Sequence, residues 1–577
     1  MKALLLATLA LAAMQAQAQS ATEGNTPDKR PGQRCQIQNN TTGNVLPPGA
    51  HDDALFKLLS AQPRCPGNAL EFRNLVLANK MSSRPSMVAN RGFHNPLPQG
   101  SFSFFESIDG SYAGQKLVPG DWFYGHFTAA SIDNTALTSI LSPQQAATPD
   151  NLLLETLVWD PRKQMYNFYE IRGTGQGGQW FYRGDSADIQ ADIANLWRAY
   201  DPSQPIFMGP PDSSGKATLP RLRCSGCHMN GGPIMKELAF PHDSWWRPER
   251  PLPLGAMRIA PEYVTILDNL VSSEIFSGWI KAGNEKLASS PAYMKQRSAL
   301  SLQEQLRPIF CEQEVNLDSD LLPFEGPATT IKAPIGAFVD QRLAGDIKYI
   351  EIDKTLYTNS LNLFQAQFFD YQSGSFQNSV QPINQIDADH AFETPVKSHT
   401  DRLLAQKMVA SGLIDEKFLY DVLAIDPTRP MFSPQRCGLL QLVPGGGPTP
   451  NWRTQFTQAL TNAGTPAAKA LLANMNDPAR TPEWHRNQVK QILTRVQSLA
   501  QVQLSVNGFV RLLAGRRIAV YQAQISQHPQ GQIFEPGFRL IFPTMQLFQK
   551  NQQQIAYGGV PDQYWLNPVT GAVELVP

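Results

Sequence analysis

The pentapeptide Cys224-Ser225-Gly226-Cys227-His228 places two thiols and an imidazole within five residues, in a chain with six cysteines. The same residues could form a zinc site, a redox dithiol or a haem attachment site. Structural zinc needs four ligands in a tetrahedron, and no second Cys or His pair follows at short spacing. A thioredoxin-like dithiol needs a strand before it and a helix after it, within a βαβ unit. A Pro- and Gly-rich loop precedes Cys224 instead.

Covalently attached haem fits every position of this motif. Two thiols separated by two residues can add to the two vinyl groups of one haem, and a histidine directly after the second thiol can bind the iron. We therefore expect one covalent haem c, attached through Cys224 and Cys227, with His228 as the proximal iron ligand. Zinc and dithiol chemistry are the alternatives. The sequence has no second Cys-x-x-Cys-His.

The motif resembles the attachment site of c-type cytochromes, and Gly231-Gly232-Pro233 resembles the turn that follows it in that family. The resemblance implies that a backbone carbonyl, here of Gly232 or Pro233, accepts the N–H of the iron-bound imidazole. Such a bond orients the ring and raises its basicity. The resemblance is specific for haem attachment and covers only a small part of the chain.

The ligand on the other side of the iron decides between electron transfer and chemistry at an open site. The sequence offers three methionines and two histidines as candidates: Met235, Met257, Met294, His126 and His242. We favour Met257, because it lies in a Pro- and Gly-rich loop of the kind that presents distal methionines. Ordinary core packing and hydrogen bonding are the competing interpretations of all five residues.

A second cluster, "AFPHDSWWRPER", follows the motif. Trp245 and Trp246 could pack against the haem edge. Nearby cations could pair with the haem propionates, as arginine does with carboxylates: Arg221, Arg223, Lys236 and Arg247. Ordinary aromatic packing beside a charged surface is the alternative interpretation.

The N-terminus predicts export. Lys2 precedes an apolar run from Ala3 to Met14, and Ala16-Gln17-Ala18 forms a small-x-small cleavage site. We expect residues 1–18 to be a signal peptide and the protein to be periplasmic. In an oxidising compartment the four remaining cysteines, Cys35, Cys65, Cys311 and Cys437, can form disulfides in three pairings. We expect Cys35–Cys65 with Cys311–Cys437, because the first two share a short segment.

Charge and hydropathy limit the partners. The formal net charge is +0, and no cluster of basic residues indicates nucleic acid or an anionic membrane surface. No later apolar stretch approaches the roughly 20 residues that span a bilayer. The expected partner is a redox protein or a small-molecule substrate, with no nucleic acid and no integral membrane segment after signal removal.

Hydrophobic periodicity predicts an α+β chain that is mainly α, with an aromatic β-meander before the haem region and a helical C-terminal portion. The resemblance implies that the haem region itself is helical and cytochrome c-like. After the signal peptide we expect a flexible leader over 19–50, a mixed region over 51–215 with the meander at 151–183, a haem-bearing domain over 216–443 and a C-terminal region over 444–577. Pro444-Gly445-Gly446-Gly447-Pro448 marks the last boundary.

Three functions remain open. The first is a periplasmic mono-haem cytochrome that transfers electrons. The second is a haem c-dependent oxidoreductase, a peroxidase or oxygenase with an open distal site, which is motivated by a chain much longer than a one-haem carrier needs. The third is a binding protein in which haem is structural or sensory.

Overall fold

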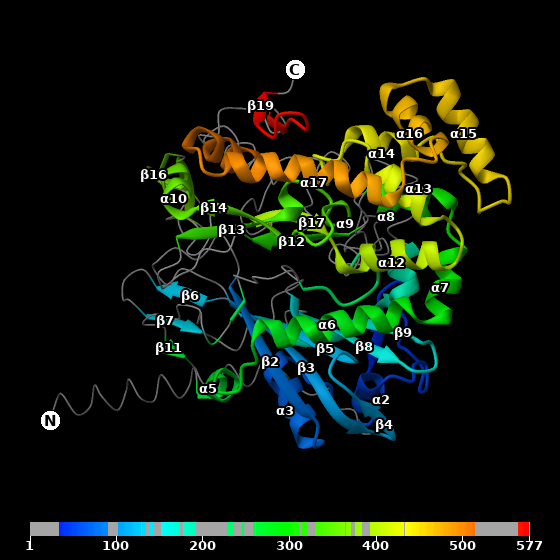
Figure 1. Ribbon diagram of the computed structural model, residues 1–577. Helices are drawn as coiled ribbons and strands as arrows, with labels where there is room; N and C mark the ends of the chain where they lie inside the picture. Colours follow the sequence, from blue (N-terminus) through cyan, green and yellow to red (C-terminus); the bar gives the residue numbers. More distant parts are fainter. Residues whose placement is uncertain are drawn as a thin grey trace.

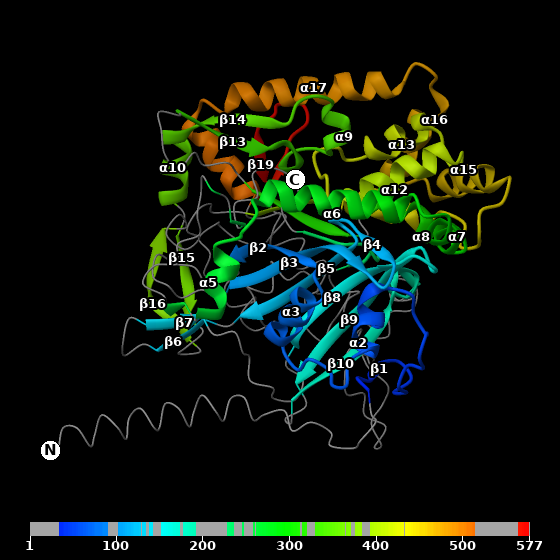
Figure 2. The same ribbon diagram turned by 90° about the horizontal axis from the view of Figure 1, so that it is seen from below.

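The computed structural model places a large sheet and a mainly helical half on either side of the long helix α6 (Figures 1 and 2). It describes residues 34–89, 102–128, 130–133, 138–141, 152–173, 177–191, 228–235, 245–246, 248, 258–259, 261–311, 314–319, 329–363, 365–370, 375–382, 393–431, 433–513 and 564–575.

An eight-stranded mixed sheet organises the N-terminal half, with strand order β1-β10-β9-β8-β5-β3-β2 and β4 paired to β3. Its neighbours are antiparallel except for β1 and β10, which run parallel. The strands are β1 (Ile37–Asn39), β2 (Ser82–Ala89), β3 (Phe102–Tyr112), β4 (Gln115–Leu117), β5 (Trp122–Thr128), β8 (Leu152–Asp160), β9 (Met165–Gly173) and β10 (Gly178–Asp185).

Two hydrophobic cores form on the two faces of this sheet. Helices α2 (Ala54–Ser60) and α3 (Ala69–Ala78) cover one face, where Phe72 packs against Trp122 and Trp180. Helix α6 (Ser273–Ala288) covers the other, where its Phe276 contacts Phe123. Residues of β9 alternate between the two cores, as expected for a strand buried on both faces.

The expected β-meander is confirmed. Strands β8, β9 and β10 are consecutive and antiparallel, and Gly173 pairs with Gly178 across the glycine-rich connection. A helix begins after β10 at residue 186, and the Asp185 carboxylate accepts hydrogen bonds from the N–H groups of Ala187 and Asp188 at its start. Aspartate is one of the residues preferred at such an N-cap.

Small elements lie beside the sheet and connect it to the helical half. Strands β6 (Ala130–Asp133), β7 (Thr138–Leu141) and β11 (Arg258–Ile259) form a three-stranded sheet. Helix α5 (Pro261–Leu267) leads to α6, and α7 (Pro291–Ser298) follows it. The sequence predicts one helix over 262–282, but the structure divides this span into α5 and α6. Ser272 caps the start of α6 by accepting the N–H of Ile275.

The other half consists of helices around short strand pairs, β12 with β17, β13 with β14 and β15 with β16. Its helices are α8 (Leu302–Phe310), the 3-10 helix η2 (Ile335–Ala337), α9 (Gln341–Ala344), α10 (Lys354–Leu363), α12 (His399–Ala410), α13 (Glu416–Leu423), α14 (Pro434–Leu440), α15 (Trp452–Ala463), α16 (Pro466–Asn476) and α17 (Pro482–Leu499). Its strands are β12 (Val315–Ser319), β13 (Thr330–Pro334), β14 (Tyr349–Asp353), β15 (Gln365–Asp370), β16 (Ser375–Pro382), β17 (Glu393–Lys397), and the C-terminal pair β18 (Tyr564–Leu566) and β19 (Val573–Leu575).

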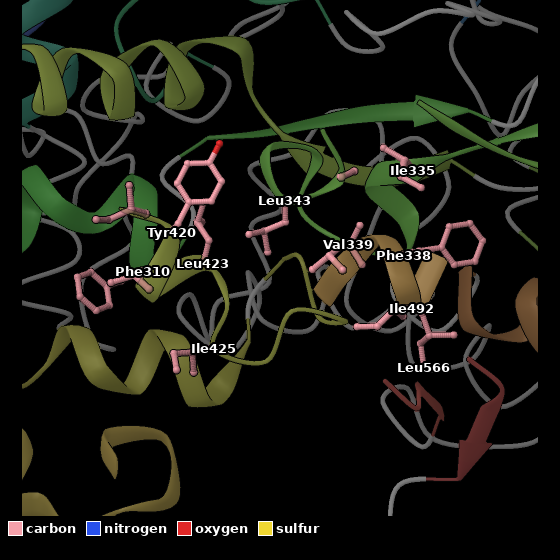
Figure 3. Close-up of a cluster of buried hydrophobic side chains, with 14 of the residues drawn as sticks. Phe310, Ile335, Phe338, Val339, Leu343, Tyr420, Leu423, Ile425, Ile492 and Leu566 are labelled. Atoms are coloured by element: carbon pink, nitrogen blue, oxygen red, sulfur yellow. The ribbon is translucent and has the colours of Figure 1, made fainter. Parts of the chain in front are cut away.

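One hydrophobic core joins these elements and extends from Leu302 to Leu566 in the sequence. Figure 3 shows part of it, with Phe310 of α8 near Leu423 of α13, and Ile492 of α17 near Leu566. The core therefore includes residues on both sides of the glycine run at 445–447. Within that run the carbonyl of Gly446 accepts the N–H of Leu302, which ties it to the start of α8.

Both expected disulfides are present, Cys35–Cys65 and Cys311–Cys437. The first holds the segment before β1 against the loop between α2 and α3, so β1 pairs with the sheet inside the span expected to be a flexible leader. The second links the end of α8 to α14. No helix among the residues described above is both long and apolar enough to cross a lipid bilayer.

The expected fold class is wrong. The chain is not a mainly helical, cytochrome c-like protein, because its N-terminal half is built on an eight-stranded mixed sheet. The error arose over 84–122, where Gly, Pro and Ser among the aromatics indicate loops. The structure places most of β2 and all of β3 there, and Pro85 lies in β2, an edge strand of the sheet, where a missing N–H is tolerated.

Near the other edge of the sheet, His51 lies buried against the rings of Phe56, Tyr169 and Tyr182. Neither of its ring nitrogens has a hydrogen bond within the described part of the chain. Burial, assisted by the nearby Lys163 cation, lowers the pKa of His51 from 6.5 to about 4. The unfolded chain therefore takes up this proton at a higher pH than the folded chain does.

We predict that His51→Phe makes stability less sensitive to acid. Between pH 6.5 and about 4 the unfolded wild type binds a proton at His51 and the folded state does not, so wild-type stability falls as the pH falls. The free energy of unfolding of the variant, minus that of the wild type, should be about 2 kcal/mol more positive at pH 5 than at pH 8. Urea titrations at the two pH values measure it, and an equal difference at both would contradict the prediction.

Candidate haem-binding site

The residues directly after the second cysteine of the motif form a buried loop from His228 to Met235. It lies against the α6 side of the sheet and also reaches residues of the helical half, where α12 packs against α6 (Figure 1). Cys224 and Cys227 lie outside the described residues. The site is therefore built here from His228 and from the groups that hold its loop.

A short hydrogen bond fixes the orientation of His228. Its Nδ1 lies 2.7 Å from the carbonyl oxygen of Gly232, and a carbonyl only accepts, so Nδ1 carries the proton. The lone pair of the neutral imidazole is then on Nε2, which is the nitrogen that a metal bound on the far side of the ring requires. Of the two acceptors expected from the sequence, the structure has Gly232.

Phe168 of β9 packs against the His228 ring from the sheet. The two ring centroids are 5.3 Å apart and the planes are inclined by 61°, an edge-to-face contact. Phe168 belongs to the core between the sheet and α6, together with Met235 from the end of the same loop. The imidazole is thus restrained by a polar contact within its own loop and by an apolar contact from the sheet.

Two glycines allow the loop to pass close to its neighbours. Gly231 has φ +73°, and a Cβ on it would lie 2.4 Å from the carbonyl oxygen of Ser186. The Ser186 hydroxyl in turn donates to the carbonyl of Gly231 at 2.7 Å. A Cβ on Gly232 would lie 2.5 Å from Oδ1 of Asn284 in α6. Gly231 meets backbone that cannot move aside and has a positive φ, so the turn depends on glycine there, whereas a Cβ at Gly232 would require the Asn284 side chain to shift.

Asn230 connects the loop to the helical half. Its side-chain amide donates to the Asp401 carboxylate in the first turn of α12 at 2.8 Å, and its backbone N–H donates to the Glu314 carboxylate at 3.1 Å. Its carbonyl accepts the Tyr293 hydroxyl at 2.7 Å, and Gln190 donates to that hydroxyl from the sheet side. All five side chains are buried, so these bonds are shielded from water and strengthened.

The other candidate iron ligands are only partly described. Met235 is buried in the core beside the sheet, and Met294 of α7 packs against the same core. Both match the competing interpretation that they are core residues. His126 belongs to β5, but its side chain lies outside the described residues, as do Met257 and His242 entirely.

Trp245 is buried in the core rather than on the surface. It stacks on Phe276 of α6, with centroids 5.8 Å apart, and contacts Phe105 of β3. Trp246 is half-buried, and its backbone N–H donates to the carbonyl of Met87 in β2. The cations expected to pair with the propionates lie outside the described residues: Arg221, Arg223, Lys236 and Arg247.

The sequence did not reveal the residues that hold the loop. Glu314 and Asp401 are 84 and 171 positions from Asn230, and no spacing rule connects them. Phe168 was visible only as one aromatic of a strand. The Asn-Gly-Gly triplet after His228 and Met229 was the available signal, since it predicts a tight turn that has to close on itself.

The geometry is compatible with metal binding by the imidazole. With its proton on Nδ1 directed at the Gly232 carbonyl, the ring can offer the lone pair of Nε2 to a metal without reorienting. Two thiols that precede it in the sequence can hold a porphyrin covalently. No family model matches the sequence, and no curated protein or solved structure resembles it at a significant level.

We predict that Gly231→Ala is far more damaging than Gly412→Ala. Both glycines have φ +73°, but nothing lies within 4 Å of a Cβ at Gly412. The matched variant should therefore cost only about 1 kcal/mol of backbone strain. Gly231→Ala adds a clash with backbone and should cost at least about 3 kcal/mol. Urea unfolding measures both, and equal losses would show that the loop can move away from Ser186.

Proposed function

We propose that the protein is an exported mono-haem c-type cytochrome that transfers electrons, with haem attached to Cys224 and Cys227 and its iron bound by His228. The hydrogen bond from His228 Nδ1 to the Gly232 carbonyl carries the proposal. It involves the residue that the attachment motif assigns to the iron and one of the two acceptors that the resemblance to c-type cytochromes implies.

The surroundings of the imidazole favour this chemistry. A histidine that ligates iron gains basicity when its second nitrogen donates to a carbonyl, and an apolar shell limits water at the metal. Gly232 supplies the first, and the core containing Phe168 and Met235 supplies the second. Haem bound here supplies a one-electron redox centre, whereas this chain orients the imidazole, holds its proton on Nδ1 and excludes solvent.

The loop contacts agree with electron transfer, in which the ligand keeps its position while the iron changes oxidation state. Asn230, Gly231 and Gly232 are each held by bonds or close packing from a different element, so the ligand loop is preorganised. A ligand that does not move when the iron changes oxidation state keeps the reorganisation of the site small. Both disulfides also agree with an oxidising compartment, in which export would place the chain.

The first test is the attachment of haem. Protein exported together with a haem-attachment system should be red, and its mass should exceed that of the processed polypeptide by one haem. The Cys224→Ala, Cys227→Ala variant should lose both the colour and the added mass. The matched control, Cys35→Ala with Cys65→Ala, also removes two thiols but should keep its haem while losing about 2–5 kcal/mol of stability.

Carbon monoxide tests the function itself. A six-coordinate cytochrome should show low-spin spectra in both oxidation states and should not bind carbon monoxide when reduced. If the protein is red but binds carbon monoxide rapidly, the proposal of haem stands and that of electron transfer with a filled distal site is refuted. A colourless, unmodified wild type would refute the haem itself.

A further inference from the structure

The face of β9 that carries Phe168 also carries buried charges. Side chains alternate along a strand, so Phe168, Glu170 and Arg172 share one face, whereas Tyr169 and Ile171 belong to the core under α2 and α3. Phe168 is the residue in contact with the His228 ring. Glu170 is therefore two residues along the strand from Phe168, the residue that contacts the ring, and Arg172 is four residues from it.

The neighbouring strand adds Arg183 at the level of Phe168. Tyr182 of β10 pairs with Tyr169 and Asp185 pairs with Asn167, so Arg183 and Gly184 together stand opposite Phe168. This is a β-bulge, a feature that redirects a side chain. Gly184 has φ +104°, a conformation open to glycine. Arg183 is completely buried, with an exposed fraction of 0%.

Glu170 lies between the two arginines. Its Oε1 is 3.4 Å from Nε of Arg172 and 3.6 Å from Nε of Arg183. These separations are ion-pair distances, and Glu170 Oε1 has no hydrogen bond within the described residues. Glu155 of β8 stands opposite Glu170 in the sheet and is half-buried. Charges held in such an interior act on one another, and on nearby charges, with little screening.

We propose that Arg183 and Glu170 set the reduction potential of a haem iron bound by His228, with Arg183 raising it and Glu170 lowering it. The inference rests on the proposed function. Reduction adds one electron to the iron, so a nearby buried cation stabilises the reduced state and a buried carboxylate stabilises the oxidised state. Arg183 and Glu170 act through the field at the iron rather than by binding it.

The size of the effect follows from Coulomb's law. A unit charge on the order of 10 Å away, at an effective dielectric constant of about 20, changes an equilibrium by about tenfold. Removing the Arg183 charge should therefore shift the ratio of reduced to oxidised protein about tenfold toward the oxidised form. Removing the Glu170 charge should shift it by a similar factor the other way.

The experiment compares the haem-loaded wild type with Arg183→Gln and Glu170→Gln in one mediator-buffered solution, and reads the reduced fraction from its absorption. Arg73→Gln is the matched control. Arg73 of α3 is also a buried arginine, paired with the buried Glu106 of β3. This pair lies on the face of the sheet that α3 covers, and β3 is three strands from β9. Arg73→Gln should change the ratio much less, by about threefold or below.

Opposite shifts in Arg183→Gln and Glu170→Gln, with Arg183→Lys within about twofold of the wild type, would support the inference. Shifts in the same direction, or a control that moves as far, would overturn it and indicate a structural effect on the haem pocket. If Arg183→Gln fails to hold haem, the shift in Glu170→Gln decides. A wild type without haem would overturn this inference together with the proposed function, whereas a haem-loaded wild type with unresponsive variants would overturn the inference alone.

Discussion

The hydrogen bond between His228 Nδ1 and the Gly232 carbonyl determines what the rest of the site can do. It closes a turn of five residues, so the ring and its acceptor belong to one rigid unit. The turn depends on Gly231, which has a positive φ and no Cβ to meet the Ser186 backbone, and Gly232 lets it pass close to Asn284. Ligand orientation is thus a property of the loop itself, and the surrounding elements need only hold the loop in place.

Those elements come from both halves of the molecule. Ser186 and Phe168 approach from the sheet, whereas Glu314 and Asp401 approach from the helical half. Because these side chains are buried and the bonds to Glu314 and Asp401 are charge-assisted, they contribute more than surface contacts of the same number would. The loop therefore joins the halves as well as carrying the candidate ligand.

The sequence predicts local features of this protein well and its architecture poorly. The meander at 151–183 and both disulfides follow from patterning, turn residues and cysteine spacing. The sequence did not predict strand β3, because glycine and serine interrupt its aromatics. The wrong expectation of a mainly helical fold followed from that omission. The contacts of Asn230 escaped for a different reason, because packing between distant segments leaves no periodic signal.

The burial of the loop restricts when haem could be joined to the chain. Asn230 bonds to Asp401, which lies 171 positions further along the sequence, so the loop over residues 228–233 is enclosed only after the second half has folded. If haem is attached to Cys224 and Cys227 as proposed, the attachment points directly adjoin this enclosed loop. Maturation would therefore have to act on the newly exported chain, and a variant that folds faster than it is modified would be trapped as a closed, haem-free protein.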